Sequence, residues 1–84
     1  MPAARLTLIG KPGCHLCDDA REVVASVLAD FDGVTIEELS ILEHADLHEK
    51  YVEEIPVLLL NGAVHNIWRV DANRIRAALK EATA

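Results

Sequence analysis

The chain has 84 residues, of which 51 % are hydrophobic and 26 % charged, and its formal net charge is −6. This composition is typical of a single soluble globular domain covering residues 1–84, and the acidity opposes binding to nucleic acid or to an anionic membrane surface. No segment has the run of about 18 to 20 apolar residues that a membrane span needs, and none at the N-terminus is typical of a signal peptide, so we expect a cytoplasmic protein.

The first half of the chain predicts a strand, a helix and a second strand. Residues 5–9 (RLTLI) are mostly apolar and are followed by Gly10, as in a buried strand that ends in a turn. Apolar residues between 20 and 31 then recur with the spacing of one helix face. Residues 34–39 begin with β-branched side chains and predict a strand that extends to Ile41.

A second helix and a β-hairpin are predicted next. Ser40 and Asp46 each have a glutamate three residues later, so the helix should begin between them and end near Val52. Residues 56–60 and 63–68 flank an Asn-Gly pair, the strongest short-range hairpin signal, and should form two antiparallel strands.

The last predicted element is a helix that Asp71 caps. Its apolar face consists of Ala72, Ile75, Ala78, Leu79 and Ala82. The resulting order, β-α-β-α-β-β-α, predicts an α/β fold. A right-handed crossover makes the first two strands parallel, and the hairpin completes a four-stranded mixed sheet with helices on its faces.

Cys14 and Cys17 lie where the first strand leads into the first helix. One helical turn separates them, so both sulfur atoms can lie on one side of the helix and form a disulfide. The positive end of the helix stabilises a thiolate at Cys14, and Lys11 and His15 add positive charge, although the acidic residues after Cys17 oppose it. In a cytoplasmic chain this pattern favours a dithiol redox pair.

Two other uses of the cysteines remain open. In the first alternative, both cysteines are inert buried side chains. In the other they bind zinc or an iron–sulfur cluster, which needs about four ligands. The histidines that could supplement the cysteines lack the paired spacing of a zinc finger; these histidines are His15, His44, His48 and His65. A cluster could also be shared between two chains of a dimer.

The segments "CHLC" and "EIPVLLLNG", together with the order of elements, resemble the glutaredoxin family of the thioredoxin fold. The chain is most similar to small bacterial glutaredoxin-like proteins with a CHLC centre. This resemblance implies that Cys14 is the nucleophile and that Cys17 resolves the mixed disulfide. It also implies a cis peptide bond between Ile55 and Pro56, whose backbone pairs with the substrate.

The resemblance further implies a groove for glutathione or another substrate. Its candidate residues are Lys11, Ile55, Pro56, Arg69 and Asp71. The family's Thr-Val pair before the cis-proline is replaced here by Glu54-Ile55, and its Gly-Gly pair before the last helix is absent from "WRVDAN". We therefore expect weak use of glutathione, with the guanidinium of Arg69 partly replacing the missing amide contacts.

These features predict a monomeric thiol–disulfide oxidoreductase without a bound cofactor. Its substrates would be disulfides of proteins or low-molecular-weight thiols, and glutathione is one candidate reductant. The alternatives are a metal or iron–sulfur carrier that uses the same cysteines, and a non-catalytic interaction module of the thioredoxin fold. Trp68 and Tyr51 are interpreted as packing residues in the core or at its rim.

Overall fold

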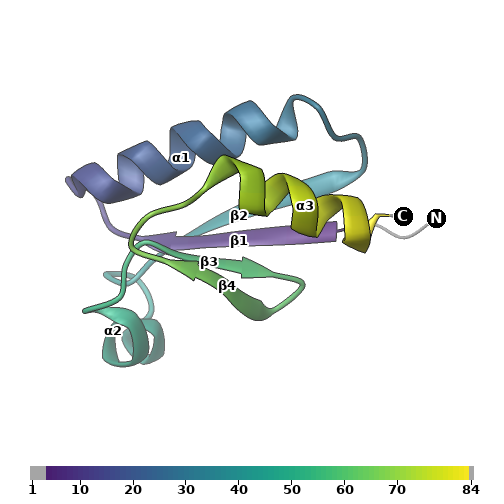
Figure 1. Cartoon of the computed structure of the whole chain (residues 1–84). Helices are drawn as coiled ribbons and strands as arrows, with labels where there is room; N and C mark the ends of the chain where they lie inside the picture. Colours follow the sequence, from purple (N-terminus) through teal and green to yellow (C-terminus); the bar gives the residue numbers. More distant parts are fainter. Residues whose placement is uncertain (1–3, 84) are drawn as a thin grey trace.

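The computed structural model describes residues 4–83 and has the predicted order of elements (Figure 1). The elements are β1 (Ala4–Gly10), α1 (His15–Leu28), β2 (Val34–Ser40), α2 (Ala45–Tyr51), β3 (Val57–Leu60), β4 (Ala63–Ile67) and α3 (Ala72–Ala82). The strands form a four-stranded sheet in the order β2-β1-β3-β4. As predicted, β1 pairs with β2 in parallel, while β1–β3 and β3–β4 are antiparallel.

The helices cover both faces of this sheet, with α1 and α3 on one face and α2 on the other (Figure 1). Successive side chains of β1 point to opposite faces. Leu6 and Leu8 therefore pack toward α1 and α3, and Ile9 packs toward Tyr51 of α2. Six of the seven residues of β1 are buried, because this strand is central and covered on both faces. Among residues 4–83, no helix is long and apolar enough to cross a membrane.

Several predicted boundaries shift for local reasons. β3 begins at Val57 rather than at Pro56, which lacks the N–H that a strand ladder uses. β4 ends at Ile67 rather than at Trp68, because Trp68 takes a positive φ of 64°. The helix α2 begins at Ala45, inside the predicted interval, but neither predicted capping box provides its N-cap.

The β3–β4 hairpin turn has the predicted geometry. Asn61 and Gly62 have φ angles of 51° and 87°, as a type I′ turn requires at both central positions. The Asn61 side-chain oxygen also accepts a hydrogen bond of 2.9 Å from the backbone N–H of Arg5. This bond holds the turn against the start of β1.

The sheet register brings three loops to one end of the molecule. Ile9 of β1 pairs with Val57 of β3, and Val57 pairs with Ile67 of β4. The loop after Ile9 carries the two cysteines, the residue before Val57 is the predicted cis-proline, and the loop after Ile67 leads to α3. The candidate functional residues therefore gather at this end of the sheet.

Candidate functional site

Cys14 is the N-cap of α1. Its backbone is extended, with φ −98° and ψ 115°, and its sulfur accepts a hydrogen bond of 3.3 Å from the backbone N–H of Cys17. The sulfur thus takes the place that a Ser or Asp oxygen usually occupies at a helix start. Both cysteines are free thiols, and Cys14 is partly exposed. An acceptor sulfur at the positive end of a helix is well placed to carry negative charge.

Cys17 lies one turn inside α1 and is only 1 % exposed. Its sulfur packs against Gly10, where a Cβ atom would lie 2.8 Å from Sγ. Burial, and next the Cys14 side chain, raise the pKa of the Cys17 thiol to about 11, although the backbone N–H of Lys11 acts in the opposite direction. At neutral pH Cys17 is therefore a protonated thiol, and a side chain at position 10 would crowd its sulfur.

The peptide bond between Ile55 and Pro56 is cis, as the family resemblance implied. Pro56 is buried and Ile55 is half-buried. The Pro56 carbonyl accepts a hydrogen bond of 2.8 Å from the backbone N–H of Trp68, which ties the cis-proline to the loop before α3. No backbone hydrogen bond joins Ile55 to the rest of residues 4–83. The backbone of Ile55 is therefore available to an incoming chain.

The other predicted groove residues lie at the same end of the sheet but differ in exposure and in the hydrogen bonds that they already form. Lys11 is exposed in the β1–α1 loop, and Arg69 is exposed in the β4–α3 loop. Asp71 is the N-cap of α3, and its Oδ1 accepts hydrogen bonds of 2.8 and 3.3 Å from the backbone N–H groups of Asn73 and Arg74. Much of the hydrogen-bonding capacity of the Asp71 carboxylate is therefore used within its own helix.

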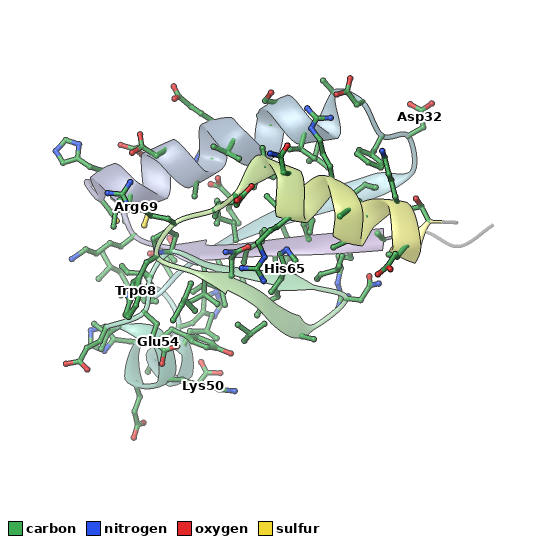
Figure 2. The ribbon with its side chains drawn as sticks, viewed as in Figure 1. Asp32, Lys50, Glu54, His65, Trp68 and Arg69 are labelled. Atoms are coloured by element: carbon green, nitrogen blue, oxygen red, sulfur yellow. The ribbon has the colours of Figure 1, made fainter. Side chains whose placement is uncertain are left out.

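The two large aromatic residues behave differently. Tyr51 is 7 % exposed and belongs to the core between the sheet and α2. Trp68 is 53 % exposed, so it belongs to the rim rather than to the core. Its indole Nε1–H donates a hydrogen bond of 3.0 Å to the carbonyl of Glu53. Figure 2 shows Trp68 and Arg69 along the loop at the end of the sheet where α1 begins.

A cavity of about 350 Å³ opens beside Cys17, between α1 and the end of β2. An ion pair of 2.5 Å between Arg21 Nε and Glu38 Oε1 lines it, and Arg21 also contacts Asp18 at 2.8 Å. Sequence analysis missed this ion pair because Arg21 and Glu38 lie on different elements. The sequence carries no local signal that brings them together.

His15 lies between the two cysteines and Asp18 follows Cys17, but in the described part of the chain these side chains are not grouped as metal ligands. Among residues 4–83, no three or more His, Cys, Asp or Glu side chains are grouped so that they could hold a metal ion. His44 and His48 are exposed at the start of α2 and within it, and His65 is on β4. The candidate site of this chain thus consists of two thiols, a cis-proline loop and exposed basic side chains.

A model of the glutaredoxin-like domain family (DUF836) matches residues 5–80. The chain belongs to this family. Its curated relatives include "Uncharacterized protein Rv0508" of Mycobacterium tuberculosis and "Uncharacterized protein Mb0520" of Mycobacterium bovis. Each is 29 % identical over 87 residues, which cover 99 % of this chain and 90 % of the relative.

Solved structures place this glutaredoxin-like domain within the thioredoxin fold. The X-ray structure of the structural genomics target XcR50 from X. campestris is 35 % identical, with a TM-score of 0.72, and the match covers 92 % of this chain and 97 % of that one. A mutant thioredoxin from Halobacterium salinarum has a TM-score of 0.73 at 19 % identity, covering 99 % of this chain and 77 % of the thioredoxin. The latter similarity concerns the fold alone.

Proposed function

We propose that this glutaredoxin-like protein is a thiol–disulfide oxidoreductase in which Cys14 is the nucleophile and Cys17 is the resolving thiol. The observation that carries the proposal is the contrast between two sulfurs one helical turn apart. Cys14 is partly exposed and accepts a backbone N–H at the tip of α1, whereas Cys17 is 1 % exposed with a raised pKa of about 11. An incoming disulfide reaches the first sulfur and not the second.

The reaction consists of two thiol–disulfide exchanges. The Cys14 thiolate attacks one sulfur of the substrate disulfide, forming a mixed disulfide and releasing the other half of the substrate as a thiolate that takes up a proton. Cys17 then loses its proton and attacks the Cys14 sulfur, which releases the second substrate thiol and leaves a Cys14–Cys17 disulfide. The substrate gains two electrons and the protein loses two. A low-molecular-weight thiol or a reductase restores the dithiol.

The cis-proline loop supplies the substrate contact in this proposal. The backbone groups of Ile55 have no backbone partner within residues 4–83, so they can pair with an extended substrate segment beside the mixed disulfide. Lys11, Arg69 and Asp71 border the same end of the sheet. Glutathione should react only weakly. In the family, two glycines in the loop before the last helix bring backbone amides close to glutathione, whereas this chain has Trp68 in that loop.

Single cysteine variants test the assignment of roles. Cys17→Ser should accumulate a mixed disulfide when it reacts with a small disulfide, because the resolving thiol is missing, whereas Cys14→Ser should not. Intact mass spectrometry after an acid quench measures both products. Equal trapping by the two variants would contradict the proposed roles. Trapping by neither would contradict the oxidoreductase itself.

The metal carrier is the rival function, and metal analysis separates it from the redox function. The protein purified without chelator should hold far less than one zinc or iron per chain. This expectation follows because residues 4–83 offer two thiolates and no grouped third and fourth ligands. Stoichiometric metal, or visible absorption by a cluster, would favour the carrier.

A further inference from the structure

The loop between β4 and α3 holds a bulky residue in a backbone conformation that such residues rarely adopt. Trp68 has φ 64°, in the left-handed region, where a glycine carries no steric cost. Its side chain is nevertheless 53 % exposed, so packing of the ring in the core does not explain the residue. Costly backbone conformations of this kind concentrate at binding and catalytic sites. Packing in the core therefore gives no reason for a tryptophan at this position.

Hydrogen bonds on both sides fix this loop. The backbone N–H of Trp68 donates to the Pro56 carbonyl at 2.8 Å, and the indole Nε1–H donates to the Glu53 carbonyl at 3.0 Å. The buried Asn66 donates from Nδ2 to the Arg69 carbonyl at 3.0 Å. With its N–H already bonded, the indole offers only its apolar ring to a ligand. Because the ring is held in advance, a ligand loses little conformational entropy in packing against it.

The charge of Arg69 is available at the same place. Within residues 4–83, Arg21 and Arg76 form ion pairs with acidic side chains, but Arg69 forms none. Arg69 is exposed, and in Figure 2 it lies at the level of the first turn of α1, while Glu54 lies on the other side of Trp68. A guanidinium without a partner binds a carboxylate through paired, charge-assisted hydrogen bonds.

We propose that Trp68 and Arg69 form a recognition corner for disulfides that carry a carboxylate a few bonds from the sulfur. Arg69 binds the carboxylate, and the indole ring packs against the carbon chain between the carboxylate and the sulfur. This arrangement holds the substrate disulfide over Cys14, because Trp68 is bonded to the cis-proline loop beside the redox pair. The inference rests on the proposed oxidoreductase function and names its substrate class.

Three small disulfides of similar size test the charge preference. They are 3,3′-dithiodipropionate, which is anionic, bis(2-hydroxyethyl) disulfide, which is neutral, and cystamine, which is cationic. The reduced protein is mixed with each in a single-turnover reaction, quenched with acid and analysed by mass spectrometry. Each rate constant is divided by that of dithiothreitol with the same disulfide. We expect the normalised rate constant with the anionic disulfide to exceed that with the cationic disulfide by about tenfold. One charge-assisted hydrogen bond accounts for a difference of this size.

Variants assign this preference to the corner. Arg69→Gln should abolish the preference by lowering the normalised rate with the anionic disulfide, whereas Lys80→Gln, an equal charge change at an exposed position of α3, should keep the preference. Trp68→Gly and Trp68→Ala should both slow the anionic substrate by the same factor. Trp68→Gly should unfold at a higher urea concentration than Trp68→Ala, because glycine adopts φ 64° freely.

The outcomes separate this inference from the oxidoreductase function. Equal normalised rates for the three disulfides, or a preference that survives Arg69→Gln, would overturn the recognition corner and leave the redox function intact. A Trp68→Gly variant with the rate of the unchanged protein would overturn the role of the ring. No reaction with any disulfide would overturn the proposed function itself.

Discussion

Replacing Gly10 by alanine tests how tightly the fold confines the buried thiol. The new Cβ atom would lie 2.8 Å from Cys17 Sγ and 3.2 Å from Cys17 Cβ. Non-bonded carbon atoms pack at about 3.5 to 4.0 Å, so the contact with sulfur is short by roughly 0.7 Å or more. Both residues are buried, with Cys17 1 % exposed, and neither side can move into solvent. The Cys17 side chain must therefore turn toward the neighbouring cavity, or the backbone of β1 or of α1 must shift.

Such overpacking costs about 1 to 3 kcal/mol of the free energy of unfolding. Urea unfolding of the reduced protein, followed by far-ultraviolet circular dichroism, measures this loss. At an m-value of about 1 kcal/mol per M, as for a small domain, the midpoint should fall by about 1 to 3 M. Part of the loss should return in the double variant Gly10→Ala/Cys17→Ala, because the sulfur at 2.8 Å is then absent. We expect a coupling energy of about 1 kcal/mol or more between the two positions.

Gly33→Ala is the matched control for this cycle. Gly33 has φ 78°, and no atom beyond its chain neighbours lies within 4 Å of the place that an added Cβ would take. Its replacement therefore costs about 1 to 2 kcal/mol through the backbone alone. It should show no coupling with Cys17→Ala. If Gly10→Ala were as stable as the unchanged protein, or if its cost simply added to that of Cys17→Ala, the tight contact between Gly10 and the thiol would be wrong.

Two further predictions concern the sheet edge and the last helix. Burial and the charge of Arg74 lower the pKa of folded His65, so the unfolded chain binds a proton there at higher pH. The free energy of unfolding should therefore fall as the pH drops below about 6.5. Urea titrations at about pH 8 and pH 5 measure this fall. His65→Gln should make the fall smaller, whereas the control variant His48→Gln should not. Asp71→Ala removes the N-cap bond of 2.8 Å to Asn73 and should cost about 1 kcal/mol in thermal or urea unfolding; an unchanged midpoint would contradict its capping role.

Local patterns were sufficient to predict the elements and their order. The apolar spacing of α1, the Asn-Gly turn and the cap at Asp71 each depend on neighbouring residues. Each is confirmed, except that α1 ends at Leu28 and leaves Phe31 outside the helix. The cis bond before Pro56 came from the family resemblance and not from the residues themselves. The cysteine pair was also found from the sequence, because its spacing at a strand-to-helix junction is a local feature.

Contacts between elements could not be predicted in the same way. The fit of Gly10 against Cys17 and the Arg21–Glu38 ion pair depend on how α1 lies over the sheet. Trp68 was assigned to packing, and its left-handed backbone became evident only with the bond to the cis-proline loop. These features require the tertiary structure because their partners are distant in the chain.

A redox titration of Cys14 and Cys17 bears most directly on the proposed mechanism. The protein is equilibrated in buffers of reduced and oxidised dithiothreitol, alkylated, and analysed by intact mass spectrometry. We predict a single transition in which both thiols become protected together, the mass falls by two hydrogen atoms, and the chain stays monomeric. Stepwise oxidation of one thiol at a time, or oxidation only to a disulfide-linked dimer, would contradict a Cys14–Cys17 redox pair.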